Sequence, residues 1–440
     1  MRDDRWTTVT PWFFSDEPAA LDPIRRFLPD DGLHRAWANF SFVAESGHLH
    51  NVDLLVAGPG GLHLIELDLS QGQLRNADDV WLRTGSVGTT ASDSTRRTAE
   101  IKARHLTAVL RRATVGKFLT VPAVRGSAFL ADPHSPVDLS EPQTQGVFGP
   151  DEPARTSLPR VTRDLLGQPA GDRADRPGRR LLRALPKMLD CIGQQPFEYW
   201  PRVGTWQLTT KPVSLTDQWQ DFVAWSTVLD KVPCRVRVYA PGKSRTRTDE
   251  AVLREYLLLR DLDHPGIVSV DTLDQYPAGP VLMFHFSKRY LLRLDHILAL
   301  YGARLTPATR AGMIRQVGAG LEYAHSRQVS HGALTTRAVI GVPRTAQGEK
   351  LGDGWLDPWL QISDWHHAAA AGAGAPTAAA VNRDLRGLAG IAREICAGAL
   401  GAGLAELPDR LAADPDFARL PPAQQVRQLS LRLAAAAALC

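Results

Sequence analysis

One run of residues, from Ala324 to His366, constrains the fold of this 440-residue chain more than any other. It holds two polar loops, HGALTTRA beginning at His331 and SDWH ending at His366, and the short apolar run WLQI precedes the second. Alternating apolar residues indicate strands, and apolar residues at helical spacing indicate helices. By these patterns we expect, in chain order, a strand, a helix, a turn, a strand and three helices, at 234–240, 250–262, 264–268, 281–286, 292–300, 307–325 and 384–400. The second half of the chain is therefore predicted to fold as an α+β domain with its strands first and its helices last.

The two loops resemble the catalytic loop and the metal-binding loop of protein kinases, which read H-R-D-L-x-x-x-N and D-F-G. His331 and Leu334 keep the family's residues in the first loop, and Asp364 keeps the metal-binding aspartate in the second. The family's Arg, catalytic Asp and metal-binding Asn are replaced by Gly332, Ala333 and Ala338. Transfer of a phosphoryl group depends on positioning and charge neutralisation by such residues. The resemblance therefore implies a bilobal kinase-like fold without a working transfer site, which is a pseudokinase.

The other nucleotide-binding positions of the kinase family are also altered. Arg237 stands at the position where the family has a strand lysine that binds phosphates. Glu255 stands at the position of the glutamate on the next helix that pairs with this lysine in the family. With Asp364 they form the predicted, degenerate nucleotide site, and Asp384 matches the aspartate that anchors the catalytic loop. The stretch before Arg237 contains no glycine, so its backbone cannot close over phosphates as a glycine-rich loop does. We expect at most weak ATP binding. The alternatives are that Asp364 only caps the loop backbone, and that the domain is an atypical serine/threonine kinase.

In the first half of the chain, carboxylates stand on adjoining strands. We expect one strand around Asp53 and another ending near Glu66, joined by a tight Pro-Gly-Gly turn. Two such carboxylates can share Mg²⁺ or Mn²⁺, which prefer oxygen ligands and can promote phosphodiester cleavage. Alternate residues of a strand face the same side, so Asp68 can join the site, and Glu17 on a helix near the N-terminus can add a fourth acid. The alternative is that these acids only solvate the strand ends.

Residues 10 to 195 resemble the nuclease-related domain family (NERD), a branch of the PD-(D/E)xK nucleases. The resemblance rests on Glu17, NVDLLV at 51–56, GLHLIELD at 61–68, Gly72 and Trp81. It implies an α/β nuclease-like fold with Asp53, Glu66 and Asp68 as catalytic residues, and Glu17, Asp53 and Glu66 as metal ligands. The family ends its third strand with Glu-x-Lys, and Asp68 replaces the lysine that would neutralise developing charge. We therefore expect weak metal binding and weak cleavage.

The two halves predict two domains, a NERD-like domain at 1–200 and a kinase-like domain at 201–440. In this combination they resemble the N-terminal region of the PglW family, the large serine/threonine kinases of the phage growth limitation and BREX defence systems. The resemblance implies a nuclease-like and pseudokinase scaffold or regulator of partner defence proteins: a DNA methyltransferase, an ATPase and a phosphatase-like protein, with DNA as a further partner. The alternative is a metal-dependent DNA nuclease that the kinase-like domain regulates.

Composition excludes several other classes of protein. The chain is 44% hydrophobic and 22% charged, and its formal net charge of +4 is small for its length, so bulk electrostatics do not predict nucleic-acid or membrane binding. The four cysteines lie far apart without a C-x-x-C pair, which predicts neither a zinc site nor a disulfide framework and favours a reducing cytoplasm. The apolar stretches are too short or too interrupted to span a membrane.

Overall fold

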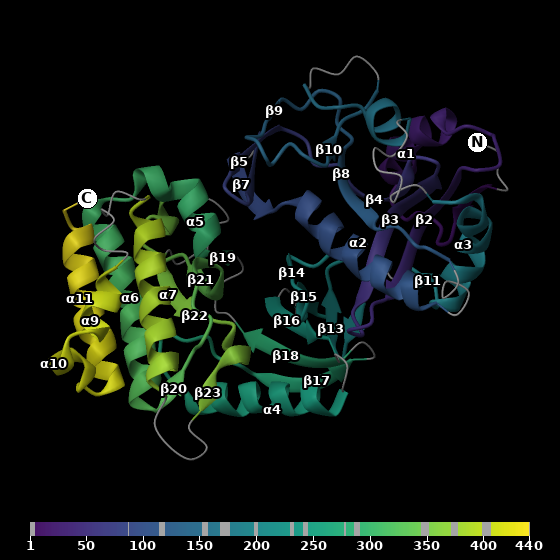
Figure 1. Ribbon diagram of the computed structural model, residues 1–440. Helices are drawn as coiled ribbons and strands as arrows, with labels where there is room; N and C mark the ends of the chain where they lie inside the picture. The colour runs from purple at the N-terminus through teal and green to yellow at the C-terminus, as the bar shows by residue number, and fades with distance from the viewer. Residues whose placement is uncertain are drawn as a thin grey trace. The chain divides into compact units, whose positions relative to one another are not determined.

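The computed structural model describes residues 5–86, 88–113, 119–151, 157–167, 177–197, 201–228, 233–240, 245–276, 279–285, 291–344, 352–370, 377–397 and 406–439 (Figure 1). Contacts divide the chain into two compact units. The first consists of Met1–Val228, Val236–Thr248 and Gln275–Val281. The second consists of Leu229–Arg235, Asp249–Asp274 and Leu282–Cys440. The boundary expected between residues 200 and 201 stays a prediction.

The main sheet of the first unit has the strand order β1-β2-β3-β4-β8-β10, with β11 beside β2 (Figure 1). Its strands are β1 (Trp6–Thr8), β2 (Arg35–Val43), β3 (Leu49–Gly58), β4 (Gly61–Asp68), β8 (Val124–Leu130), β10 (Val147–Phe148) and β11 (Gln195–Pro196). Strands β2, β3 and β4 are antiparallel, and β4 and β8 are parallel. Parallel neighbours need a crossover, and helix α2 (Thr95–Arg112) lies between them in the chain.

Helices cover both faces of this sheet. Leu55 of β3 packs with Leu106 of α2 and Leu185 of α3 (Arg179–Cys191) in one core. The neighbouring residue Leu54 packs in the other core with Ile24 of α1 (Asp16–Phe27). Because successive side chains of a strand point to opposite faces, the continuous apolar sequence of β3 supplies both cores.

The chain segments between β4 and β10 also form a smaller sheet, with the strand order β7-β6-β5-β9. Its strands are β5 (Gln73–Ala77), β6 (Val80–Gly85), β7 (Gly88–Asp93) and β9 (Val137–Asp138). Trp81 of β6 is buried with Leu74 and Leu130, so this meander contributes a third core. A π-helical turn at Val161–Leu166 places Val161 and Leu166 in the α1-side core.

A third sheet has the strand order β12-β13-β15-β16-β18-β17, with β14 beside β15. Its strands are β12 (Arg202–Val203), β13 (Trp206–Leu208), β14 (Ser214–Leu215), β15 (Trp219–Ser226), β16 (Pro233–Tyr239), β17 (Thr272–Tyr276) and β18 (Gly279–His285). The helix α4 (Arg245–Asp261) follows β16. Strand β16, helix α4 and strand β18 agree with the strand, helix and strand expected in this region.

Strands β12 to β15 of the third sheet belong to the first unit, and the second unit is mainly helical. The principal helices are α5 (Leu294–Tyr301), α6 (Pro307–Ser326), α7 (Ala378–Ile395), α9 (Leu407–Ala412), α10 (Pro415–Ala418) and α11 (Pro422–Ala437). The short strands are β19 (Leu292–Arg293), β20 (Val329–Ser330), β21 (Val339–Val342), β22 (Trp359–Ile362) and β23 (Ala369–Ala370). A Cβ on Gly318 of α6 would meet the Oγ of Ser430 at 2.0 Å, so glycine permits the close approach of α6 and α11.

The prediction of a mixed fold with sheets and helices is confirmed. Among the residues described, none of the helices has the length and apolar character needed to cross a bilayer.

Candidate functional site

Asp53 lies at a local distortion of the main sheet. Ala38 of β2 belongs to the α1-side core and Phe40 to the α2-side core, although a regular strand keeps alternate residues on one face. Asn39, between them, has a φ of 56°, in the left-handed region, and its Nδ2 donates to the carbonyl of Thr10 at 3.0 Å. The strand register places Asp53 of β3 opposite Asn39. Such backbone distortions occur often at functional sites.

The carboxylates of Asp53 and Glu66 lie together on neighbouring strands. The register pairs Leu54 of β3 with Ile65 of β4, and the two acids form the next pair along. Both are buried, with 2% and 1% of their surface exposed. Asp53 Oδ2 accepts a hydrogen bond from the backbone N–H of Leu67 at 2.8 Å. The structure thus brings together the two acids that the sequence placed on adjoining strands.

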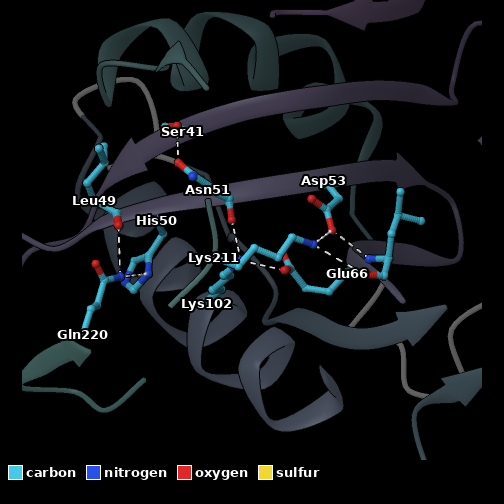
Figure 2. A network of polar contacts seen from close by, with 10 residues as sticks. Ser41, Leu49, His50, Asn51, Asp53, Glu66, Lys102, Lys211 and Gln220 are labelled. Carbon is cyan, nitrogen blue, oxygen red and sulfur yellow. Dashed lines mark hydrogen bonds and ion pairs between the residues drawn. The ribbon is translucent and has the colours of Figure 1, made fainter. Parts of the chain in front are cut away.

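A lysine from helix α2 completes this pair, and the sequence patterns did not single it out. Lys102 Nζ donates to Glu66 Oε2 at 2.6 Å and to the carbonyl of Asn51 at 2.6 Å (Figure 2). Its side chain is only 4% exposed. A signal was present in the sequence, since Lys102 stands between Ala99 and Leu106 on the apolar face of α2. A lysine on a buried helix face needs a charged partner.

A second lysine reaches the same carboxylates from the loop between β13 and β14. Lys211 Nζ donates to Asp53 Oδ2 at 2.7 Å, and the carbonyl of Leu67 lies 3.5 Å from it (Figure 2). The Lys211 side chain is 42% exposed, while that of Asp53 is 3% exposed. We call Asp53, Glu66, Lys102 and Lys211 the acid–lysine cluster.

The charges of the cluster shift its pKa values in different directions. Burial acts to raise the pKa of Asp53, but the ammonium groups of Lys211 and Lys102 outweigh it and hold that pKa below its ordinary value. Burial raises the pKa of Glu66, and the Asp53 charge adds to this against the opposing charge of Lys102. Burial acts to lower the pKa of Lys211, but Asp53 and Glu66 raise it above its ordinary value. Divergent pKa values in adjoining carboxylates are typical of acid–base sites.

The other two predicted acids are placed differently. Asp68 Oδ2 accepts from Arg83 Nη2 of strand β6 at 2.8 Å, and Asp68 Oδ1 accepts from the backbone N–H of Ser70 at 3.0 Å. Arg83 thus compensates the charge of Asp68. Glu17, in the first turn of α1, contributes to the negative field that raises the pKa of Lys211. Glu17 therefore lies within electrostatic reach of the cluster.

The oxygen atoms of the cluster suit a divalent metal with few protein ligands. Across the described ranges, no group of three or more His, Cys, Asp or Glu side chains is arranged to hold a metal ion. Glu66 Oε1 is buried and has no hydrogen-bond partner among the described residues. Mg²⁺ is commonly held by one or two carboxylates while it keeps several waters. Asp53 and Glu66 fit that donor set, with the orphaned oxygen of Glu66 available to a cation.

Histidines form a second buried network next to the cluster. His50 Nε2 lies 2.7 Å from His105 Nδ1. The other ring nitrogen of His50 lies 3.4 Å from Gln220 Nε2, as Figure 2 shows. The Gln220 amide also donates to the carbonyl of Leu49 at 3.0 Å. Burial lowers the pKa of His48 to about 4 and holds that of His50 well below its ordinary value. The rings of His48 and His50 are therefore neutral near pH 7, and His50 joins strand β3 to strand β15 through Gln220.

Arg237 is engaged by a strand neighbour. Its Nε and Nη2 donate to the two oxygens of Asp221 at 2.7 and 2.9 Å, and each side chain is 1% exposed. The guanidinium also stacks over the ring of Trp219, 4.5 Å from its centroid. This bidentate pair directs the planar fork of Arg237 toward strand β15. Arg237 belongs to the first unit, and the other two residues of the predicted nucleotide site belong to the second.

In the second unit, Asp384 of α7 holds the loop that begins at His331. Its Oδ2 accepts from the backbone N–H of His331 at 2.8 Å, and its Oδ1 accepts from that of Gly332 at 2.7 Å. His325 Nε2 lies 2.9 Å from Asp384 Oδ2. His331 Nε2 donates in turn to the carbonyl of Ser363 at 2.7 Å. Asp384 therefore anchors the first loop, and His331 connects it to the second.

The remaining predicted residues of the nucleotide site lie in this unit. Glu255 of α4 is buried, with 3% of its surface exposed. Asp364 has a left-handed backbone, with a φ of 65°, and its Oδ1 accepts from the Oγ of Ser363 at 3.2 Å. The side chains of Ala333 and Ala338 offer no polar atom for a proton or a metal.

No family model matches the chain. The chain is similar to the probable kinase PglW of Streptomyces coelicolor, with 32% identity over 383 residues. The match covers 84% of this chain and 23% of PglW. The similarity shows that the chain is related to PglW along most of its own length, and the chain spans about a quarter of the length of that relative.

Proposed function

We propose that the first unit is a nuclease-like module of the PD-(D/E)xK type, and that Asp53, Glu66 and Lys102 form its site for phosphodiester cleavage in DNA. The observation that carries the proposal is the contact of 2.6 Å between Lys102 Nζ and Glu66 Oε2. The sequence lacks the lysine expected at position 68, which is an aspartate. Lys102 supplies an ammonium group beside the same glutamate from helix α2. The positive charge expected from a strand lysine at position 68 is therefore provided by a helix.

Each residue has a separate role in this proposal. Asp53 and Glu66 would hold Mg²⁺ or Mn²⁺, which when bound stabilises the charge that develops on the phosphate. Lys102 neutralises part of the same developing charge and orients a water molecule near Glu66. In the protein without metal, burial raises the pKa of Glu66, so this carboxylate binds a proton more readily than an exposed glutamate does.

We propose further that the kinase-like region is a pseudokinase that acts as a scaffold or regulator. The bidentate pair with Asp221 supports this because it occupies the fork of Arg237, the group expected to hold phosphates. Ala333 cannot accept a proton from a substrate hydroxyl, and Ala338 cannot bind a metal. The hydrogen bonds from the backbone of His331 and Gly332 to Asp384 hold the first loop although the catalytic Asp and the metal-binding Asn of the kinase family are missing.

The relationship to PglW supports the proposal that these two modules act in phage defence. The protein would act in the cytoplasm with the methyltransferase, the ATPase and the phosphatase-like protein that the family resemblance implies. A scaffold without cleavage is the second candidate function, and the metal-binding and cleavage measurements decide between the two.

The test is nicking of supercoiled plasmid DNA by the full chain with Mn²⁺ or Mg²⁺. We expect metal-dependent nicking that Asp53→Asn abolishes and that Lys102→Met reduces by about 10²-fold or more, the usual cost of losing one group that stabilises charge. Asp68→Asn is the matched control and keeps its activity, because Arg83 and not the cluster engages Asp68. Mn²⁺ binding by Lys102→Met, measured in parallel, separates a loss of chemistry from a loss of fold. Nicking that survives Asp53→Asn contradicts the proposal. The proposal also fails if neither the wild type nor Lys211→Met, which lacks the lysine on Asp53, nicks the plasmid.

A further inference from the structure

The ammonium group of Lys211 lies where oxygen atoms converge. Asp53 Oδ2 is 2.7 Å from Lys211 Nζ, and the carbonyl oxygen of Leu67 is 3.5 Å from it. The charge of Glu66 also acts on Lys211. Two carboxylates and a backbone carbonyl are the hard oxygen donors that a divalent cation prefers. Lys211 therefore occupies one of the two carboxylates, Asp53, that a metal would use.

We propose that Lys211 is a built-in cation that closes the metal site, so that a divalent metal and Lys211 compete for Asp53. The inference rests on the proposed function, because it deepens the account of the same carboxylates. The protein is inactive while the ammonium group is on Asp53 and becomes competent when that group leaves. This arrangement is an autoinhibitory contact within one chain.

The structure allows the head group to leave without disturbing the core. The Lys211 side chain is 42% exposed, so much of it already faces solvent while its ammonium group contacts Asp53. The loop that carries it is fixed on both sides, since Thr209 N–H donates to Val223 O at 2.9 Å and Val213 N–H donates to Asp221 O at 2.8 Å. The side chain can therefore swing away while the loop stays anchored to β15. Side-chain rearrangements of this kind are fast and need no local unfolding.

Exchange of the two cations also changes the charge of the site in the direction that catalysis needs. With both carboxylates ionised, the ammonium groups of Lys102 and Lys211 balance them. Replacement of Lys211 by a divalent cation leaves Lys102 in place and raises the net charge by one unit. A phosphate group of DNA is attracted more strongly to the open cluster than to the closed one.

The position of Lys211 in the sequence suggests how the contact is controlled. Strands β13 and β14, on either side of Lys211, both pair with β15. Strand β15 neighbours β16, which carries Arg237. A movement of β15 would therefore withdraw Lys211 from Asp53, and a bound partner or ligand that shifts this sheet would open the site.

The first experiment measures Mn²⁺ affinity of the full chain by electron paramagnetic resonance. If the open form is about a tenth of the molecules, the apparent affinity is about tenfold weaker than the intrinsic one. We therefore expect Lys211→Met to bind Mn²⁺ about tenfold more tightly than the wild type. The matched control, Lys187→Met, removes an exposed lysine from α3 and leaves the affinity unchanged. Asp53→Asn in the Lys211→Met background abolishes the tight site. Equal affinity in the wild type and Lys211→Met, or no binding by either, overturns the proposal.

The second experiment uses the wild-type chain and is independent of how any variant folds. Acetylation of Lys211 by an amine-reactive ester is followed by mass spectrometry with and without Mn²⁺. The metal should expel the ammonium group and speed acetylation of Lys211 severalfold, while Lys187 reacts at the same rate in both samples. An unchanged rate at Lys211 in saturating Mn²⁺ refutes the competition. If Lys211→Met binds Mn²⁺ tightly and does not nick DNA, the competition stands and the proposed nuclease function fails.

Discussion

Replacement of Lys102 by methionine should destabilise the first unit because it leaves a buried carboxylate without its nearest counter-charge. Lys102 Nζ and Glu66 Oε2 are 2.6 Å apart, and the side chains are 4% and 2% exposed. Removal of one partner from a buried ion pair costs about 3–5 kcal/mol. Lys211 lies in the same cluster and still acts on Glu66. The expected cost is therefore at the lower end of that range, about 3 kcal/mol at pH 8.

The cost should fall in acid, and its sign follows from the pKa of Glu66. Burial raises this pKa in the native protein, and loss of Lys102 raises it further. A carboxyl group with a raised native pKa binds more protons folded than unfolded, so its contribution to stability falls as pH rises. Lys102→Met should thus lose less stability near pH 5 than at pH 8. Lys102→Met/Glu66→Gln, which removes both charges, should recover to within about 1 kcal/mol of the wild type.

Hydrogen–deuterium exchange of peptides from β3 and β4 measures this effect in the full chain. A cost of about 3 kcal/mol speeds exchange by roughly two orders of magnitude when exchange follows the opening equilibrium. Lys187→Met, on an exposed position of α3, should leave these peptides unchanged. A cost below about 1 kcal/mol for Lys102→Met at pH 8, or a double variant no more stable than the single one, refutes the buried-pair reasoning.

Two further predictions concern pH and phosphate transfer. Because burial lowers the pKa of His48 to about 4, the folded state binds fewer protons than the unfolded state below pH 6.5. Stability should fall as pH drops from 6.5 toward 4, with about 2 kcal/mol lost at pH 5 through His48 alone, and urea unfolding of His48→Asn should show a correspondingly smaller pH dependence. The full chain should incorporate no radiolabelled phosphate from Mg-ATP, since Ala333 and Ala338 cannot supply the missing proton acceptor and metal ligand; incorporation that Asp364→Ala removes would show an atypical kinase instead.

The parts of the site that lie close together in the sequence were predictable. Asp53 and Glu66 belong to strands joined by a tight turn, and a hairpin fixes which residues face one another. Helix α2 likewise carries Ala99, Ala103, Leu106 and Leu110 at helical spacing on its buried face, a pattern that indicates a helix from the sequence alone. Local patterns determine these features, so they can be read before any tertiary contact is known.

The parts that depend on distant segments were not predictable from those patterns. Lys102 is 36 residues from Glu66, and Lys211 is 158 residues from Asp53. No periodicity links such positions, because only the tertiary fold brings them together. The strand pairing of β5, β6 and β7 was also missed, and with it the Arg83 side chain that engages Asp68. The ion pair between Arg237 and Asp221 also could not be predicted, because it depends on strands β15 and β16 lying side by side, and no sequence pattern indicates that pairing.

What matters for the cluster is that an ammonium group lies beside Glu66, and not which helix or strand carries the lysine. In the family pattern the strand lysine follows the glutamate by two residues, on the same face of the sheet. Helix α2 packs on that face, since Leu106 shares a core with Leu64 of β4, and a lysine on its buried side can reach the glutamate equally well. Once Lys102 provides the charge, position 68 is free to take an aspartate, and Arg83 compensates the reversed charge from β6. The substitution at position 68 therefore does not by itself argue for a dead site. Under the proposed function, the ammonium group of Lys211 on Asp53 is the stronger reason to expect low activity in the isolated protein, because it contacts a carboxylate that would bind the metal.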